Sequence, residues 1–275
     1  MSQAQDRTPS ENPAETYERY FVPALFVPWT QVLLEHAAPQ PGERVLDVAC
    51  GTGVVARHVA PLVGPAGAVV ALDISPAMIE VARSIPAAEG APIVWTEGSA
   101  VALPYPAGAF DLVLCQQGLQ FFPDRATATQ EMRRVLGPHG RVALSVWQTL
   151  PQNPVHEALD SAIARYLGTT ASALATAFAL GDADELRALL TAAGFQRVEV
   201  APVTRTMRFP EPARFVQLMV LASAASVPVF AQMDAVARTA LVEAVAREME
   251  PTLRSHIDGD TVAVPLAAHI GLAHV

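Results

Sequence analysis

Short apolar runs and amphipathic stretches alternate through the first half of the chain. The apolar runs are rich in valine and leucine, which is typical of strands buried on both faces of a parallel sheet. They occupy residues 45–48, 68–73, 93–96, 110–115 and 140–147. The amphipathic stretches at 54–62, 75–84 and 125–136 predict the intervening helices. This alternation predicts an α/β fold with a mostly parallel sheet.

The alternation is interrupted twice in the second half of the chain. We expect helical cap insertions at about 149–182 and 211–255. The second insertion contains residues 215–233, which carry no charge. Such a stretch suits the wall of an apolar ligand pocket, and ordinary core packing of a helical cap explains it equally well.

Three further elements complete the predicted sheet and its helices. Residues 182–193 predict a helix, 196–209 a long strand, and 261–274 a closing strand. Pro265 favours a bulge or a strand end over the middle of a ladder, because proline has no N–H to donate. Together with the five earlier runs, these two late strands make seven.

The N-terminal segment before the first strand has apolar and aromatic residues at helical spacing. Residues 14–38 predict two short helices, separated by breaks at Pro23 and Pro28. Residues 1–13 are polar and predict a disordered tail. They lack a basic region followed by an apolar run, so no signal peptide is expected.

A glycine turn follows the first strand. Gly51 and Gly53 allow a tight turn with the backbone close to a ligand, and the next helix begins at about Val54. A strand, a glycine turn and a helix N-terminus together present free backbone N–H groups to a bound molecule.

The spacing of this turn fits two cofactors. Gly51-Thr-Gly53-Val-Val-Ala56, with Asp73 further on, matches the dinucleotide-binding pattern of NAD enzymes. Asp47 favours the other interpretation, because a carboxylate beside the turn repels a pyrophosphate and attracts a cationic ligand with an ammonium and a sulfonium. That ligand is S-adenosylmethionine (SAM). Asp47 could instead be structural and bond the N–H groups of the turn itself.

Composition narrows the classes of function. The 275 residues (29.1 kDa) are 51% hydrophobic and 16% charged, so a large core can form and global disorder is not expected. A net charge of −9 argues against nucleic-acid and anionic-membrane partners. The absence of lysine excludes a Walker A loop and any lysine Schiff base.

The two cysteines and the hydropathy pattern add little chemistry. Cys50 and Cys115 each end a predicted core strand and are expected to be buried, without a disulfide or a metal site. No purely apolar stretch is long enough for a membrane span. We therefore expect a cytoplasmic enzyme that binds no metal.

Val45-Leu-Asp-Val-Ala-Cys-Gly-Thr-Gly53 resembles the first motif of class I SAM-dependent methyltransferases, and most of all the ubiquinone/menaquinone biosynthesis branch. Ala49 stands where many members have glycine. The resemblance implies a three-layer, Rossmann-like sheet whose last strand is antiparallel and lies between the fifth and sixth. It also implies lid helices at 14–40 and a methyltransferase domain over 41–275.

The resemblance also implies a cofactor site along the strand ends, with SAM as donor and S-adenosylhomocysteine as product. Asp73 would hold the ribose, Ser99 replaces the aspartate that usually holds the adenine, and backbone around Gln116 would hold the ammonium. The predicted cofactor-binding residues are Asp47, Ala49, Gly51, Gly53, Asp73, Ile74, Met78, Gly98, Ser99, Ala100, Gln116 and Tyr20.

Three residues after the fourth strand are expected to meet the substrate: Gln117, Gln120 and Phe121. Some relatives carry arginine at the Gln120 position. Glutamine cannot supply that charge, so the substrate, or the way it is bound, is expected to differ from theirs. The three glutamines at 116, 117 and 120 could equally be amides that pack a loop.

The predicted function is SAM-dependent methylation of a small molecule. The sulfonium donor is already activated, so alignment of the acceptor and exclusion of water are the main tasks of the protein. We assign no general base, because His156 and His256 are better explained as packing or surface residues. A nicotinamide oxidoreductase and a non-catalytic SAM-binding protein are the alternatives. A homodimer is left open.

Overall fold

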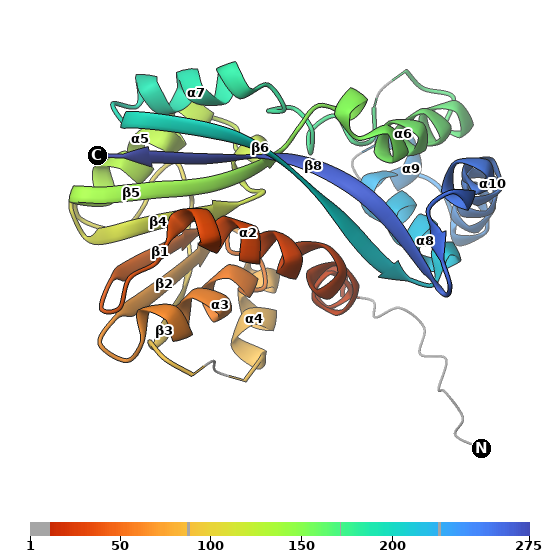
Figure 1. Ribbon diagram of the computed structural model, residues 1–275. Helices are drawn as coiled ribbons and strands as arrows, with labels where there is room; N and C mark the ends of the chain where they lie inside the picture. The colour runs from red at the N-terminus through yellow and green to blue at the C-terminus, as the bar shows by residue number, and fades with distance from the viewer. Residues whose placement is uncertain (1–11, 87–88, 171, 225–226) are drawn as a thin grey trace.

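Seven strands follow one another in a single mixed sheet, and the short strand β7 pairs with β8 outside this row. The computed structural model describes residues 12–86, 89–170, 172–224 and 227–275. The order across the sheet is β3-β2-β1-β4-β5-β8-β6 (Figure 1). The strands are β1 (Arg44–Val48), β2 (Ala68–Asp73), β3 (Ile93–Glu97), β4 (Phe110–Gln116), β5 (Leu136–Trp147), β6 (Gln196–Pro210), β7 (Ile257–Asp258) and β8 (Thr261–His274).

Strands β1 to β5 are mutually parallel, and β8 runs antiparallel between β5 and β6. The predicted fold class, including the strand order implied by the resemblance, is confirmed.

The helices are α1 (Pro13–Thr16), the π-helix η1 (Tyr17–Phe26), α2 (Val27–Ala37), α3 (Val54–Val63), α4 (Pro76–Ser84), α5 (Arg125–Val135), α6 (Pro154–Tyr166), α7 (Ala183–Ala192), α8 (Pro212–Ala224), α9 (Pro228–Ala231) and α10 (Ala235–Arg254), with 3-10 turns η2 (Leu119–Phe121) and η3 (Leu150–Gln152).

Helices cover both faces of the sheet and create two hydrophobic clusters. Successive residues of a strand point to opposite faces, so Val45 joins the cluster under α2 and α3, while Leu46 joins the cluster under α5 and α7. Within the described chain, no helix is both long and apolar enough to cross a membrane.

The N-terminal segment is one continuous helical path, so the predicted breaks at Pro23 and Pro28 are wrong. The junction residues Tyr17 and Val27 keep right-handed helical dihedrals. Pro23 lies inside η1, where the wider π turn gives its ring more room than an α-helix does. Pro28 stands in the first turn of α2, where a missing N–H costs little. Of the tail predicted at residues 1–13, residues 1–11 lie outside the described residues.

Strands β6 and β8 extend beyond the rest of the sheet as a two-stranded ribbon. Pro265 lies in the middle of this ladder, opposite Thr206, which corrects the expectation of a bulge or an end. The pairing of β8 with β5 begins only at Ala268, so Pro265 has a ladder partner on one side alone. Proline is tolerated there because its nitrogen has no N–H to donate, and no second strand lies beside it to accept one.

Helices α6, α8 and α10 gather beside this ribbon (Figure 1). Buried residues of all three helices, among them Leu159, Met219 and Val245, join the cluster on the α2 side of the sheet. Among the described residues of the first insertion, η3 and α6 are helical, and the rest are turns, bends and unassigned backbone. Gly168, with φ of 63°, follows the helix, because glycine adopts left-handed dihedrals without strain.

Candidate functional site

A cavity of about 460 Å³ opens at the carboxyl ends of β1, β2, β3 and β4. Ligands of open α/β sheets bind at this edge, where the strand order turns back. Its lining residues are Tyr17, Phe26, Ala49, Gly51, Leu72, Asp73, Ile74, Ser75, Met78, Gly98, Ser99, Ala100, Val101, Gln116, Gln117, Gly118, Phe121, Phe122 and Pro123.

Most of the predicted site residues meet in this cavity. The predicted residues that line it are Ala49, Gly51, Asp73, Ile74, Met78, Gly98, Ser99, Ala100, Gln116, Gln117 and Phe121. The predicted residues outside the lining are Tyr20, Asp47, Gly53 and Gln120. Each of these four has a structural reason for its position.

The glycine turn has left-handed dihedrals at three positions. Gly51 (φ 55°) lines the cavity, and Gly53 (φ 87°) caps α3. A Cβ on Gly53 would lie 2.2 Å from the ring of Trp95, so Gly53 packs the turn against β3 and does not face the cavity. Ala49 also has positive φ, of 58°. Glycine would adopt these dihedrals with less strain, so the departure at Ala49 costs backbone energy.

Asp73 ends β2 and holds two loops together at the cavity wall. Its Oδ2 accepts the Gly51 N–H at 2.8 Å, and its Oδ1 accepts the Ser75 N–H at 2.9 Å. A carboxylate offers about four lone-pair sites, so two acceptor positions remain for a ligand. Asp73 therefore lies in the cavity wall, as predicted, and also holds the backbone of both loops.

Asp47 does not face the cavity, which corrects the charge argument based on it. Its side chain is 1% exposed, and Oδ2 accepts the Ala56 N–H at 3.0 Å. Burial raises the pKa of Asp47 to about 8, an effect that nearby Asp73 reinforces. Asp47 thus stabilises the turn from behind, which was the structural alternative, and it attracts no cation from the cavity.

The end of β4 brings the predicted glutamines together. Gln116 Nε2 donates to the Phe26 carbonyl at 3.2 Å, which ties the strand end to η1. Gln117 adopts left-handed dihedrals (φ 52°) and lines the cavity. Gln120 lies behind it and donates to Gln117 Oε1 at 3.2 Å. Gln120 therefore does not line this cavity, and its predicted contact with the substrate stays a prediction.

The β3 end of the cavity is mostly apolar. Met78, Ala100 and Val101 line it together with Ser99. The Ser99 hydroxyl accepts the Val101 N–H at 3.4 Å. Ile74 and Phe121 flank the opening and are 72% and 54% exposed. Flat apolar walls beside one hydroxyl suit a planar base with a polar edge.

Tyr17, and not Tyr20, comes from the N-terminal helices to the cavity. The Tyr17 hydroxyl lies 3.6 Å from the position that a Cβ on Gly51 would take, and its ring packs on Phe26 at 4.9 Å. The Tyr20 hydroxyl bonds Arg214 of α8 instead, with the guanidinium 4.2 Å from its ring centroid. The π turns of η1 change which side of the helix faces the sheet, and no sequence signal for them was available.

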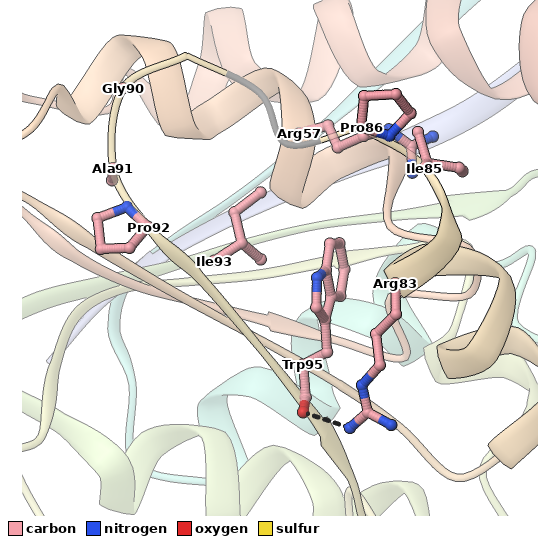
Figure 2. Close-up of a pocket in the computed structure, with 9 residues that line it drawn as sticks. All are labelled: Arg57, Arg83, Ile85, Pro86, Gly90, Ala91, Pro92, Ile93 and Trp95. Carbon is pink, nitrogen blue, oxygen red and sulfur yellow. Dashed lines mark hydrogen bonds between the residues drawn. The ribbon is translucent and has the colours of Figure 1, made fainter.

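A second hollow of about 330 Å³ lies among α3, α4 and β3 (Figure 2). Figure 2 shows Trp95, Arg57 and Arg83 around it, with Arg83 donating to the Trp95 carbonyl at 3.0 Å. Arg57 is paired with Glu18 at 2.9 Å and also donates to the Thr52 carbonyl. Because its arginines already have protein partners, we assign it no ligand.

Titratable groups near the cavity are shifted toward their neutral forms. Burial raises the pKa of Tyr17 and of Cys50, and that of Cys115 to about 12. Both thiols are buried and free, as expected. His156 of α6 is not among the residues that line the cavity. Burial lowers its pKa to about 4, and its ring packs on Phe178 at 5.7 Å, which is a packing position.

Comparisons with known proteins agree with the fold and the motif. Residues 45–140 match the family model of the methyltransferase domain. A 2-phytyl-1,4-naphtoquinone methyltransferase of Synechococcus elongatus is 37% identical over 42% of this chain and 51% of its own. The ubiquinone/menaquinone biosynthesis C-methyltransferase of Ectopseudomonas mendocina is 31% identical over 62% of this chain and 72% of its own. The chain belongs to the class I SAM-dependent methyltransferases.

This methyltransferase chain spans about half the length of the first curated relatives it matches. The YcgJ protein of Bacillus subtilis has the same fold, with a TM-score of 0.57 and 18% identity over 89% of this chain and 97% of its own. The family model ends at residue 140, before the cap insertions.

Proposed function

We propose that the chain transfers the methyl group of SAM to a small organic acceptor. The observation that carries this proposal is the cavity across four strand ends, with a glycine turn, the Asp73 carboxylate and an apolar wall in a row. The quinone methyltransferases among the relatives support a small-molecule acceptor. The net charge of −9 supports the same class over nucleic acid.

The residues present fit the cofactor. Asp73 retains two acceptor positions, which suit the two hydroxyls of a ribose. The apolar wall around Met78 and Val101 suits the adenine, with the Ser99 hydroxyl as its polar contact. At the opposite end, Gln116 lines the cavity where the amino-acid part would lie.

When bound, SAM supplies a methyl group already activated on a sulfonium. The chain then needs to bind the two reactants, orient the acceptor toward the methyl group and exclude water. Tyr17 and Phe26 of η1 line the lid side of the cavity, and the Gln116 bond to the Phe26 carbonyl holds that lid against the sheet. We propose that residues 14–40 act as the lid and that the two cap insertions wall the acceptor side.

The lining provides little base chemistry. Its titratable side chains are Tyr17 and Asp73, and burial keeps the Tyr17 phenol protonated by raising its pKa. A protonated phenol donates hydrogen bonds and does not remove protons. We therefore propose an acceptor atom that is nucleophilic without help from a side-chain base.

Calorimetry tests the cofactor. S-adenosylhomocysteine and SAM should bind, NAD should not, and Asp73→Asn should weaken S-adenosylhomocysteine about tenfold through the lost charge-assisted bonds. Asp258→Asn, a change of the same chemistry at an exposed pair with Arg208, is the control. Binding of NAD alone would overturn the proposal in favour of an oxidoreductase.

Transfer itself needs a separate test. Incubation with SAM labelled in the methyl group and with metabolite extracts should yield a labelled small molecule, and Asp73→Asn should reduce its yield. A protein that binds SAM but labels nothing across such extracts would be the non-catalytic binder.

A further inference from the structure

The helix η1 is buried along its second half and only half-buried along its first. Val22 and Leu25 lie in the core, whereas Tyr17 and Tyr20 are half-buried. Segments with few buried apolar contacts are the ones that open locally at low cost. Because Tyr17 lines the cavity, the part of the lid that faces the cavity is the part that the core holds least.

Tyr20 connects this first half of η1 to the cap. It lies one turn after Tyr17, and Arg214 of α8 donates a hydrogen bond to its hydroxyl. The Arg214 guanidinium also lies 4.2 Å from the centroid of the Tyr20 ring. A cation over an aromatic ring is attracted by the ring quadrupole, and more strongly where water is partly excluded. The Arg214 side chain is 29% exposed, so the contact is partly desolvated.

The first turn of α8 presents Arg214 from a fixed position. The Glu211 N–H donates to the Asp260 carbonyl at 2.9 Å, and the Glu211 carbonyl accepts the Arg214 N–H at 2.9 Å. Phe215 is 1% exposed, and its ring centroid lies 4.8 Å from that of Phe209 on β6. The start of α8 is therefore anchored on the ribbon of β6 and β8, and it can hold η1 in place.

A second contact holds the same half of η1 from the opposite side. Glu18 pairs with Arg57 of α3 at 2.9 Å, and both side chains are largely buried. Lifting the first half of η1 away from the cavity must break this pair and the contact between Tyr20 and Arg214. Loss of the cap contact therefore makes opening easier, while the pair on α3 still defines the closed position.

We propose that Arg214 is a positioning residue for the cofactor site: through Tyr20 it holds the first half of η1 closed and so sets how often the cavity opens. Arg214 lies beyond residue 140, where the match to the family model ends. The inference rests on the proposed function, because the ligand whose exchange it controls is SAM or its product. It gives the cap a role at the cofactor side of the site.

The rates of cofactor exchange test this role. Opening precedes both entry and exit, so the association and dissociation rate constants both scale with the open fraction, and the effect cancels in the Kd. Arg214→Met keeps a long side chain and removes the charge. It should raise both rate constants for S-adenosylhomocysteine about fivefold, from the loss of one cation–ring contact and one hydrogen bond.

Surface plasmon resonance on the immobilised full chain measures both rate constants. The Kd of Arg214→Met should stay within about twofold of the wild type, because the contact is present with and without ligand. Unchanged rate constants would overturn the inference. A faster dissociation matched by an equally weaker Kd would also overturn it, since that pattern means that Arg214 supports the site itself.

Two further variants assign the effect to the contact between lid and cap. Arg19→Met is the matched control: its guanidinium lies 5.3 Å from the same Tyr20 ring, but both residues belong to η1 and do not join it to the cap. Arg19→Met should leave the rate constants unchanged. Tyr20→Leu should reproduce the effect of Arg214→Met, and the double variant should be no faster than either single one. Additive increases would show that Arg214 acts by another route.

Amide hydrogen exchange on the ligand-free protein separates the two proposals. Exchange over residues 17–21 should be about fivefold faster in Arg214→Met than in the wild type, because it follows the population of the open state. Arg19→Met should exchange as the wild type does. Unchanged exchange in Arg214→Met would overturn the inference whether or not S-adenosylhomocysteine binds. Faster exchange in a protein that binds no S-adenosylhomocysteine would keep the lid contact and reject the proposed function.

Discussion

The two ends of the cavity satisfy their polar groups differently. At the β1–β2 end, the Asp73 carboxylate and the Asp47 Oδ2 atom bond N–H groups of the chain itself. At the β4 end, Gln116, Gln117 and Gln120 each retain one buried polar atom without a partner among the described residues. Asp47 Oδ1 and Thr52 Oγ1 at the first end also lack a partner among the described residues. The two ends therefore differ in the kind of group: carboxylates that accept backbone N–H groups at the first, and neutral amides at the second.

This difference suits a site with one constant and one variable ligand. A cofactor shared by a whole family can be met by a rigid, self-supporting turn. An acceptor that differs between members can be met by neutral amides, which both donate and accept hydrogen bonds. The following predictions test this contrast, from the largest expected effect to the smallest.

Asp47→Asn should change how stability depends on pH. The folded pKa of about 8 lies above the ordinary value for aspartate, so the folded state holds a proton that the unfolded state has lost. Stability contributed here is complete below about pH 4 and is lost as pH rises toward 8, by on the order of 5 kcal/mol at most. Asp47→Asn should remove this decline.

Urea unfolding of both proteins at several pH values measures the effect. His156, whose folded pKa is lowered to about 4, contributes the opposite slope between its unfolded pKa and pH 4. Comparing the double variant Asp47→Asn/His156→Gln with His156→Gln alone isolates the Asp47 contribution. Parallel stability curves for Asp47→Asn and the wild type would show that the carboxyl is ionised when folded.

Gly53→Ala should destabilise the fold by about 3 kcal/mol, through left-handed strain and overpacking against Trp95. Gly42→Ala is the matched control, because Gly42 has nearly the same positive φ (85°) but no atom lies within 4 Å of its added Cβ. The control should cost only about 1–2 kcal/mol. Equal midpoints for both variants in urea would contradict the packing role of Gly53.

Tyr17→Phe should weaken S-adenosylhomocysteine about fivefold, through loss of one hydrogen bond. Tyr20→Phe should leave the affinity unchanged, because the Tyr20 hydroxyl bonds Arg214. Calorimetry on the two variants compares neighbouring tyrosines of one helix. A larger effect for Tyr20→Phe would restore the original sequence prediction.

Gln120→Leu should lower stability by about 1 kcal/mol, because it removes the donor to buried Gln117 Oε1 and replaces an incompletely bonded amide with an apolar side chain, which offsets part of that loss. Thermal unfolding measures the effect. Unchanged or higher stability would contradict the alternative interpretation of these glutamines as amides that pack a loop.

The sequence alone determined the strands, most helices and the strand ends that form the cavity, because buried strands and N-caps leave local patterns of hydrophobicity and residue type. The bounds of β2 and α4 agree with those predicted. The strand order came from a family motif, since spacing does not specify which strands pair.

Only the tertiary structure decided which way individual side chains face. The motif placed Asp47 beside the turn, but its direction depends on how α3 packs, and the carboxyl lies behind the turn. The π turns of η1 brought Tyr17 to the cavity in place of Tyr20. Such directions depend on contacts between residues far apart in the chain, which local patterns do not encode.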